Sequence, residues 1–286
     1  KMNWPRYRYL NEVLGESCDV GSRLVSRQKL ISRAILPWRL DLEEARAVVN
    51  GGRYEHITMG IDWGGGGGGE LKRRRGQLVV ASGTTSFTVI AIVGLRNGTL
   101  DPELIYAERL PMGMSPPEEA KRVLALIQQF RPKIVAHDYG GAGALRETIL
   151  LQAGLRAERL MPCTYVRTST KPIVTANQPD VGRSRWSWSL DKARSLSLIC
   201  AAINNDMISF PKWPAVTEAQ TVLYEDFLSL IEDKIENPGG SDVYRITKNP
   251  KQPDDFCHAL NYACMAHWHS LSAYPDIAAK LSVDYG

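Results

Sequence analysis

The order in which apolar runs of different periodicity follow one another constrains the fold of this chain most strongly. Three strand-like runs come first, followed by a helix, a strand, a second helix and a last strand, at residues 56–62, 86–95, 103–109, 116–130, 133–138, 140–153 and 158–163. Strands joined by a short turn, such as the one signalled by Asn97 and Gly98, pair antiparallel, whereas strands separated by a helix pair in parallel. This order predicts an α/β fold with a mixed central sheet flanked by helices.

Three antiparallel strands followed by parallel ones form the ribonuclease H-like arrangement, and this is the fold class that we expect. Downstream of the sheet the apolar spacing indicates further elements. They are helices at 190–206 and 216–234, short strands at 207–210 and 243–246, and a final helix at 253–269.

The first 53 residues differ from the rest of the chain. They are rich in Arg, Leu and turn residues, with helix-like stretches at 26–36 and 40–50 that Pro37 separates and Gly51 and Gly52 end. We interpret residues 1–53 as a linker or lead-in segment and residues 54–286 as the main domain. A helical hairpin packed on that domain is the alternative interpretation.

Composition permits several function classes and argues against others. A net charge of +4 allows a nucleic-acid partner without requiring one, because solvated basic surfaces are common. The five cysteines form no CxxC pair, which argues against a zinc site, and their odd number is typical of a reducing compartment. No apolar run reaches the roughly 18 residues that a membrane span needs, so we expect no membrane partner.

Acidic residues end two of the expected strands and begin the last helix. Asp62 ends the first strand, Asp138 ends the fourth, and Asp254 and Asp255 begin the helix. Ligands bind at the carboxyl edge of open sheets, where Asp62 and Asp138 would lie side by side. Crowded carboxylates repel one another, and divalent cations with a preference for hard oxygen ligands relieve that cost. Each aspartate also has a structural interpretation, as a turn residue or a helix cap.

A run of six glycines, Gly64 to Gly69, follows the first strand. Such a run has high backbone entropy, so we expect a mobile loop that also contains the basic stretch Lys72, Arg73, Arg74 and Arg75. The run lacks the Lys-Ser/Thr ending of a phosphate-binding loop, and we expect no ATP binding of that kind.

The acidic residues and the segments around them resemble a known family, the C-terminal nuclease domain of the large terminase subunit of tailed bacteriophages. The resemblance covers most of the chain and rests on the order and spacing of several short motifs. These motifs are residues 9–15 (YLNEVLG), 59–64 (MGIDWG), 134–141 (IVAHDYGG), 190–194 (LDKAR), 208–211 (ISFP) and 254–263 (DDFCHALNYA).

The resemblance implies an endonuclease that cuts concatemeric double-stranded phage DNA during packaging, using two Mg²⁺ or Mn²⁺ ions. Its first two metal ligands fall on Asp62 and Asp138. The third falls on the Asp254–Asp255 pair, of which we favour Asp255. Some relatives carry the acid one helical turn later, where this chain has His258, which is then either a group beside the metal ligands or a packing residue.

Members of that family carry an ATPase motor before the nuclease, so the chain resembles a separated nuclease half that would not itself use ATP. The resemblance also implies the portal protein and the small terminase subunit as partners, in the host cytoplasm. The long glycine run and the basic stretch after it depart from the short turn that is usual in the family.

Basic residues in three places are candidates for DNA binding. Each lysine or arginine that meets a phosphate adds salt-dependent affinity, which is the role expected for residues 72–75. The resemblance places Lys192 and Arg194 beside the metal site. Arg183 and Arg185, with Trp186 and Trp188, form a basic and aromatic patch that could hold unpaired bases, although the tryptophans could simply pack. Nothing in this set reads base edges, so we expect weak sequence preference.

Three alternatives stay open at this stage. Residues 60–65 and 135–141 also resemble the phosphate loops of sugar kinases and actin-like ATPases, although the final helix with its two aspartates is then unexplained. Another ribonuclease H-like nuclease, such as a Holliday-junction resolvase or a transposase, would use the same chemistry on a different substrate. A DNA-binding module without catalysis would keep the basic residues and use the aspartates structurally.

Overall fold

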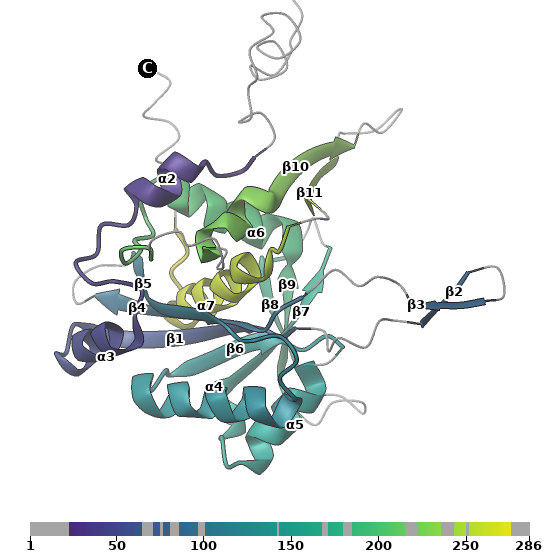
Figure 1. Ribbon diagram of the computed structural model, residues 1–286, viewed down its shortest axis with the longest axis horizontal. Helices are drawn as coiled ribbons and strands as arrows, with labels where there is room; N and C mark the ends of the chain where they lie inside the picture. Colours follow the sequence, from purple (N-terminus) through teal and green to yellow (C-terminus); the bar gives the residue numbers. More distant parts are fainter. Residues whose placement is uncertain are drawn as a thin grey trace, which may run out of the picture.

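A single mixed sheet with helices on both faces organises the chain (Figure 1). The computed structural model describes residues 23–64, 71–74, 77–80, 86–96, 101–141, 143–167, 171–179, 185–214, 222–235, 243–249 and 252–275. In spatial order the seven strands are β5 (Pro102–Arg109), β4 (Val89–Arg96), β1 (Tyr54–Asp62), β6 (Ile134–Asp138), β7 (Leu160–Val166), β9 (Ser187–Asp191) and β8 (Val174–Asn177).

Helices cover the two faces of this sheet, and two strand pairs lie outside it. The helices are α2 (Arg27–Ser32), α3 (Leu42–Asn50), α4 (Pro116–Phe130), α5 (Gly143–Gln152), α6 (Lys192–Asn204) and α7 (Asp255–Leu271), with short 3-10 turns at Ala157–Arg159 and Leu223–Ser229. The outer pairs are β2 (Leu71–Arg74) with β3 (Gln77–Val80), and β10 (Leu230–Ile235) with β11 (Val243–Lys248). Figure 1 shows α4 and α5 on one face of the sheet and α6 and α7 on the other.

The pairing of the strands confirms the predicted fold class. Strands β5, β4 and β1 run antiparallel to one another, whereas β1, β6, β7 and β9 run in parallel. Strand β8 adds an antiparallel edge that the sequence pattern did not predict. Because β1 lies at the junction of the two halves, its carboxyl end adjoins the carboxyl end of β6, as in the ribonuclease H-like arrangement.

Both faces of the central strands are buried, which explains why their sequences are almost uniformly apolar. In β4, Ile90 and Ile92 contribute to the core beneath α4 and α5, and the alternate residues Val89, Ala91 and Val93 contribute to the core beneath α6 and α7. Strand geometry sends successive side chains to opposite faces, so one apolar strand supplies both cores.

Helix α7 lies directly across β1, and a glycine makes that contact possible. A Cβ atom at Gly60 would lie 2.0 Å from the carbonyl oxygen of Ala259 and 2.4 Å from the amide nitrogen of Ala263. No side chain fits there. The hydroxyl of Thr58 donates to the carbonyl oxygen of Ala263 at 2.9 Å. These contacts fix the distance between α7 and β1, and so they fix the position in space of the first turn of α7.

A buried histidine near the end of α7 makes the fold sensitive to acid. Neither ring nitrogen of His267 has a hydrogen-bond partner among the residues that the structure describes, and its side chain is fully buried. Burial, and then the neighbouring His56, lower the pKa of His267 to about 4.

We therefore expect His267→Leu to reduce the acid sensitivity of folding. A histidine with a lowered pKa stabilises the fold above its ordinary pKa of about 6.5, and that contribution is lost as the pH falls towards 4, by up to about 3 kcal/mol. Urea unfolding from pH 7 to pH 4 measures the effect. A free-energy difference between wild type and variant that stays constant over this range would show that His267 does not titrate as expected.

Three expected elements differ from the structure. The helix predicted at 216–234 is wrong, because residues 223–229 form a 3-10 turn and residues 230–235 form β10. The apolar residues keep their helical spacing as far as Ile231, but the backbone from Leu230 onward pairs with β11. The loop expected around the basic stretch also contains a strand pair, in which Lys72 pairs with Val79 and Arg73 with Leu78. The strand expected at 207–210 is reduced to an isolated bridge between Ser209 and Glu103.

Residues 23–53 pack against the domain. Leu30 and Ala45 are fully buried in the two cores, and the amide of Leu36 donates to the carbonyl oxygen of Phe210 at 3.1 Å. Residues 1–22, the first part of the expected lead-in, lie outside the described residues, as do Gly65–Gly69. Within the described part of the chain, no helix combines the length and apolar character needed to cross a bilayer.

Candidate functional site

The carboxyl ends of β1 and β6 bring two of the predicted aspartates to one edge of the sheet. Ile61 and His137 are paired in the parallel register, so the next residues, Asp62 and Asp138, leave the sheet side by side. Helix α7 begins at Asp255, and because it crosses β1 and β6 its first turn lies over the same edge. Three segments far apart in sequence therefore supply carboxylates to one place.

The electrostatics of Asp62 show how near these groups are. Burial raises the pKa of Asp62 well above its ordinary range, and Asp255, Asp138 and Asp254 raise it further. Lys192, the first residue of α6, opposes this effect. Like charges raise the pKa of a carboxyl only at close range, so Asp62 lies within the field of all three other aspartates.

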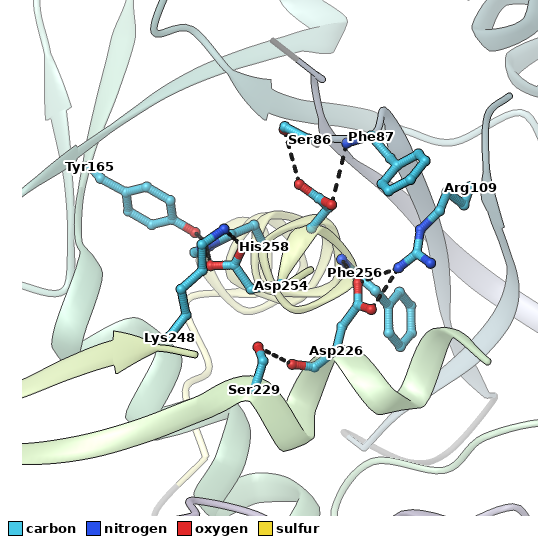
Figure 2. Close-up of polar contacts among 11 residues, drawn as sticks. Ser86, Phe87, Arg109, Tyr165, Asp226, Ser229, Lys248, Asp254, Phe256 and His258 are labelled. Carbon is cyan, nitrogen blue, oxygen red and sulfur yellow. Dashed lines mark hydrogen bonds and ion pairs between the residues drawn. The ribbon is translucent and has the colours of Figure 1, made fainter. Parts of the chain in front are cut away.

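Backbone and hydroxyl groups orient the other two carboxylates. The amide of Gly140 donates to Asp138 Oδ1 at 3.0 Å, and it partly offsets the burial that raises the pKa of Asp138. The Ser86 hydroxyl and the Phe87 amide donate to Asp255 at 3.1 and 3.3 Å, while burial raises the pKa of Asp255. Figure 2 shows Ser86 and Phe87 side by side above the start of α7.

Asp254 lies in a different environment from its neighbour. Lys248 Nζ donates to Asp254 Oδ1 at 2.6 Å, and His258 Nε2 lies 3.0 Å from Oδ2 (Figure 2). Burial opposes ionisation of Asp254, but His258 and Lys248 outweigh it and hold the pKa well below the ordinary range. Lys248 and His258 therefore already engage the Asp254 carboxylate. Asp255 is held only by a hydroxyl and a backbone amide, and of the three neighbouring aspartates it raises the pKa of Asp62 most. This difference favours Asp255 as the third metal-ligating group.

His258 belongs to a hydrogen-bonded chain beneath the carboxylates. Its Nδ1 lies 2.9 Å from the Tyr165 hydroxyl, which also accepts a hydrogen bond from Asn261 Nδ2 at 3.0 Å. The contacts of His258 thus go to Tyr165 and Asp254, and it acts on the site through them. Lys192 Nζ lies 5.4 Å from the centre of the Tyr165 ring.

The carboxylates of Asp62, Asp138 and Asp255 are the type of ligand that a divalent cation binds, although they do not converge on a single point. Among the described residues, no three His, Cys, Asp or Glu side chains converge closely enough to hold one metal ion. Asp62, Asp138 and Asp255 offer only carboxylate oxygens, the ligands that Mg²⁺ and Mn²⁺ prefer. Their mutual repulsion is the cost that a cation would relieve, and binding would draw them together.

Several solved structures are similar to this chain. The sequence matches no protein-family profile and no curated protein. The nuclease domain of the large terminase subunit of bacterial virus Sf6 is 12% identical over 84% of this chain and 96% of that chain, with a TM-score of 0.49. The human cytomegalovirus terminase nuclease domain is 13% identical over 84% and 94%, with a TM-score of 0.47.

A third example is the large terminase nuclease from thermophilic phage G20c with bound magnesium. It is 14% identical over 73% of this chain and 79% of that chain, with a TM-score of 0.42. All three of these similar structures are terminase nucleases.

The predicted DNA-binding residues lie in several different settings. Lys192 is exposed and within the electrostatic field of Asp62 and Asp138. Arg194 donates to the carbonyl oxygen of Lys171 at 2.7 Å, and Arg185 forms an ion pair with the fully buried Glu147. The backbone of Lys72, Arg73 and Arg74 lies in β2, whereas Arg75 and Arg183 lie outside the described residues.

The two tryptophans of the basic and aromatic patch have different environments. Trp186 is 47% exposed and remains accessible to a ligand. Trp188 lies in β9 and packs against the core beneath α6 and α7. Only Trp186 is therefore placed to stack on a base.

Two residues near the site were missed by the sequence analysis, and both act over long sequence separations. Lys248 ends β11, and no local pattern marks it as the partner of Asp254. Asp226 accepts hydrogen bonds from Arg109 Nη2 at 2.6 and 2.7 Å and from the Phe256 amide at 2.8 Å. Burial raises the pKa of Asp226 to about 6 even though Arg109 opposes it. Asp226 thus anchors the first turn of α7 through the amide of Phe256 (Figure 2).

Proposed function

We propose that this chain is a metal-dependent endonuclease that hydrolyses phosphodiester bonds in double-stranded DNA. The observation that carries the proposal is that Asp62 leaves the sheet beside Asp138, and that its pKa is raised by both Asp138 and Asp255. Carboxylates arranged in this way are costly without a cation and well suited to holding one. The position of Asp255 favours a nuclease over an actin-like or sugar-kinase-like protein, in which this residue has no role.

Each residue of the site has a part in this chemistry. Asp62, Asp138 and Asp255 would hold two Mg²⁺ or Mn²⁺ ions, which lower the pKa of water and neutralise charge on the phosphate. The Gly140 amide orients Asp138, and Ser86 and Phe87 orient Asp255. No side chain has to act as a covalent nucleophile.

Two lysines balance charge around the carboxylates. Lys248 forms an ion pair with Asp254 and so offsets part of the repulsion between Asp254 and its neighbour Asp255. Lys192, exposed beside Asp62 and Asp138, offers a positive charge to a DNA phosphate. Phosphate contacts of this kind position a duplex without reading its sequence, so we propose weak sequence preference.

The sequence resemblance supports a role in phage genome packaging. In this role the chain would cut concatemeric DNA beside a separate ATPase motor, with residues 1–53 as the lead-in from that motor. The portal protein and the small terminase subunit would be its other partners, in the host cytoplasm.

A plasmid cleavage assay tests the proposed activity and its need for metal. We expect supercoiled plasmid to become relaxed and linear in Mn²⁺ or Mg²⁺, and to remain intact in EDTA. A synthetic four-way junction cut in preference to linear duplex would instead indicate a resolvase. Intact plasmid in both metals, or cleavage that persists in EDTA, would contradict the proposal.

A further inference from the structure

We infer that the buried ion pair between Glu119 and Arg146, together with Thr88, positions the Asp62–Gly64 turn for metal binding. This inference rests on the proposed function, and it assigns positioning residues to a layer beneath the carboxylates. None of the three touches the carboxylate oxygens of the site in the structure. They act through the backbone that follows Asp62.

The ion pair joins the two helices on one face of the sheet. Glu119 belongs to α4 and Arg146 to α5, and they are only 6% and 2% exposed. Arg146 Nε donates to Glu119 Oε2 at 2.5 Å, and the Thr88 hydroxyl donates to Glu119 Oε1 at 2.5 Å. Both oxygens of the Glu119 carboxylate are therefore engaged.

The same groups hold Gly64 at both of its peptide groups. The Gly64 amide donates to the Thr88 hydroxyl at 2.9 Å, and Arg146 Nη2 donates to the Gly64 carbonyl oxygen at 3.0 Å. A Cβ atom at Gly64 would lie 2.8 Å from the Thr88 amide nitrogen, so this residue must be glycine to fit. The Arg146 guanidinium also lies 5.5 Å from the centre of the Trp63 ring.

Thr88, Glu119 and Arg146 together form a clamp on Gly64, and the location of this clamp indicates a function. A buried ion pair is weak evidence for stability, because apolar residues of similar volume often stabilise a fold as well or better. The core around α4 and α5 also holds a second buried polar pair, His137 and Glu147. The Glu119–Arg146 pair is distinguished by its contact with the backbone of Gly64. What the charged groups add is a fixed backbone two residues after Asp62, at the start of a glycine run that has no side chains to fix it.

The clamp also links two of the three carboxylates. Thr88 directly follows Ser86 and Phe87, which hold Asp255. One short segment therefore fixes the turn after Asp62 through Thr88 and orients Asp255 through its other two residues. Groups that orient metal ligands in this way commonly change metal affinity by about 10- to 100-fold when they are removed.

The test measures Mn²⁺ affinity, by electron paramagnetic resonance of free Mn²⁺, in variants that remain folded. Thr88→Val keeps the volume and removes the hydroxyl, and Arg146→Lys keeps the charge but lacks the fork that reaches Glu119 and Gly64 together. We expect each variant to bind Mn²⁺ about tenfold more weakly. Thr88→Ser, which keeps the hydroxyl, should restore the affinity.

Arg53→Lys is the matched control. Arg53 makes a two-pronged contact with Glu103, at 2.9 and 3.0 Å, at the opposite end of β1. The control should alter thermal stability as Arg146→Lys does, and it should leave Mn²⁺ affinity unchanged.

The outcomes separate this inference from the proposed function. Wild-type affinity in both Thr88→Val and Arg146→Lys, or an equal loss in Arg53→Lys, would overturn the positioning role while leaving the nuclease proposal intact. If wild-type protein shows no Mn²⁺ binding that Asp62→Asn removes, the metal site itself fails and the positioning role falls with it.

Discussion

Replacing Asp62 with asparagine should lower metal-dependent cleavage by about a thousandfold or more and, at the same time, stabilise the metal-free protein. A bound cation typically supplies several kcal/mol of transition-state stabilisation, and each 1.4 kcal/mol corresponds to a tenfold change in rate. Without metal, the ionised Asp62 is buried among other aspartates, and asparagine removes that repulsion. A residue kept only for structure would not show this pair of opposite effects.

The stability of the metal-free protein should depend on pH differently in wild type and in Asp62→Asn. The pKa of Asp62 is raised in the folded state, so the stability of wild type falls as the pH rises from the ordinary carboxyl range towards that higher pKa. Asp62→Asn should lack this loss. Thermal unfolding in EDTA from pH 4 to pH 8 measures this loss of stability. In the same measurement, added Mn²⁺ should stabilise wild type more than the variant. Cleavage at the wild-type rate by Asp62→Asn would rule out its assignment as a metal ligand.

Replacing the two adjacent aspartates of α7 should have opposite consequences. Asp255→Asn should abolish cleavage without lowering the stability of the metal-free protein, since burial and Asp254 raise the pKa of Asp255. Asp254→Asn should weaken cleavage far less and destabilise the fold by about 2 kcal/mol, because it removes the charged partner of Lys248 and a hydrogen bond to His258.

The two variants are matched controls for each other, since the same change is made one residue apart. The lowered pKa of Asp254 stabilises the fold above the ordinary carboxyl pKa, and that contribution is lost as the pH falls. Asp254→Asn should therefore flatten the acid side of the stability profile. Equal losses of cleavage in both variants, or a loss confined to Asp254→Asn, would contradict the assignment of Asp255 as the third ligand.

The sequence was sufficient to predict the central strands and the placement of Asp62 beside Asp138, because both depend on local patterns. It did not predict β8 and β9. Apolar runs of the right length and periodicity marked β1, β4, β5, α4 and β6. Their order implied the parallel pairing that sets Asp62 beside Asp138. The helix predicted at 216–234 was wrong because helical spacing over one or two turns does not reveal that the next residues pair with a later strand.

The finer features of the site could not be predicted because they depend on tertiary partners. Asp254 and Asp255 are equivalent in sequence, and they are distinguished by Lys248 on one side and Ser86 on the other. Glu119 and Arg146 lie on helices where charged residues usually face solvent, and only the fold shows that they are buried together. Arg185 was predicted to bind DNA, but it forms an ion pair with Glu147, a residue 38 positions earlier that no local pattern relates to it.

Anomalous scattering from a manganese-soaked crystal tests the central claim most directly. We expect a manganese peak within about 2.5 Å of carboxylate oxygens from Asp62, Asp138 and Asp255, with the three side chains drawn together around it. A map with no peak at this edge of the sheet under saturating Mn²⁺, and with the three carboxylates still apart, would contradict a metal centre there.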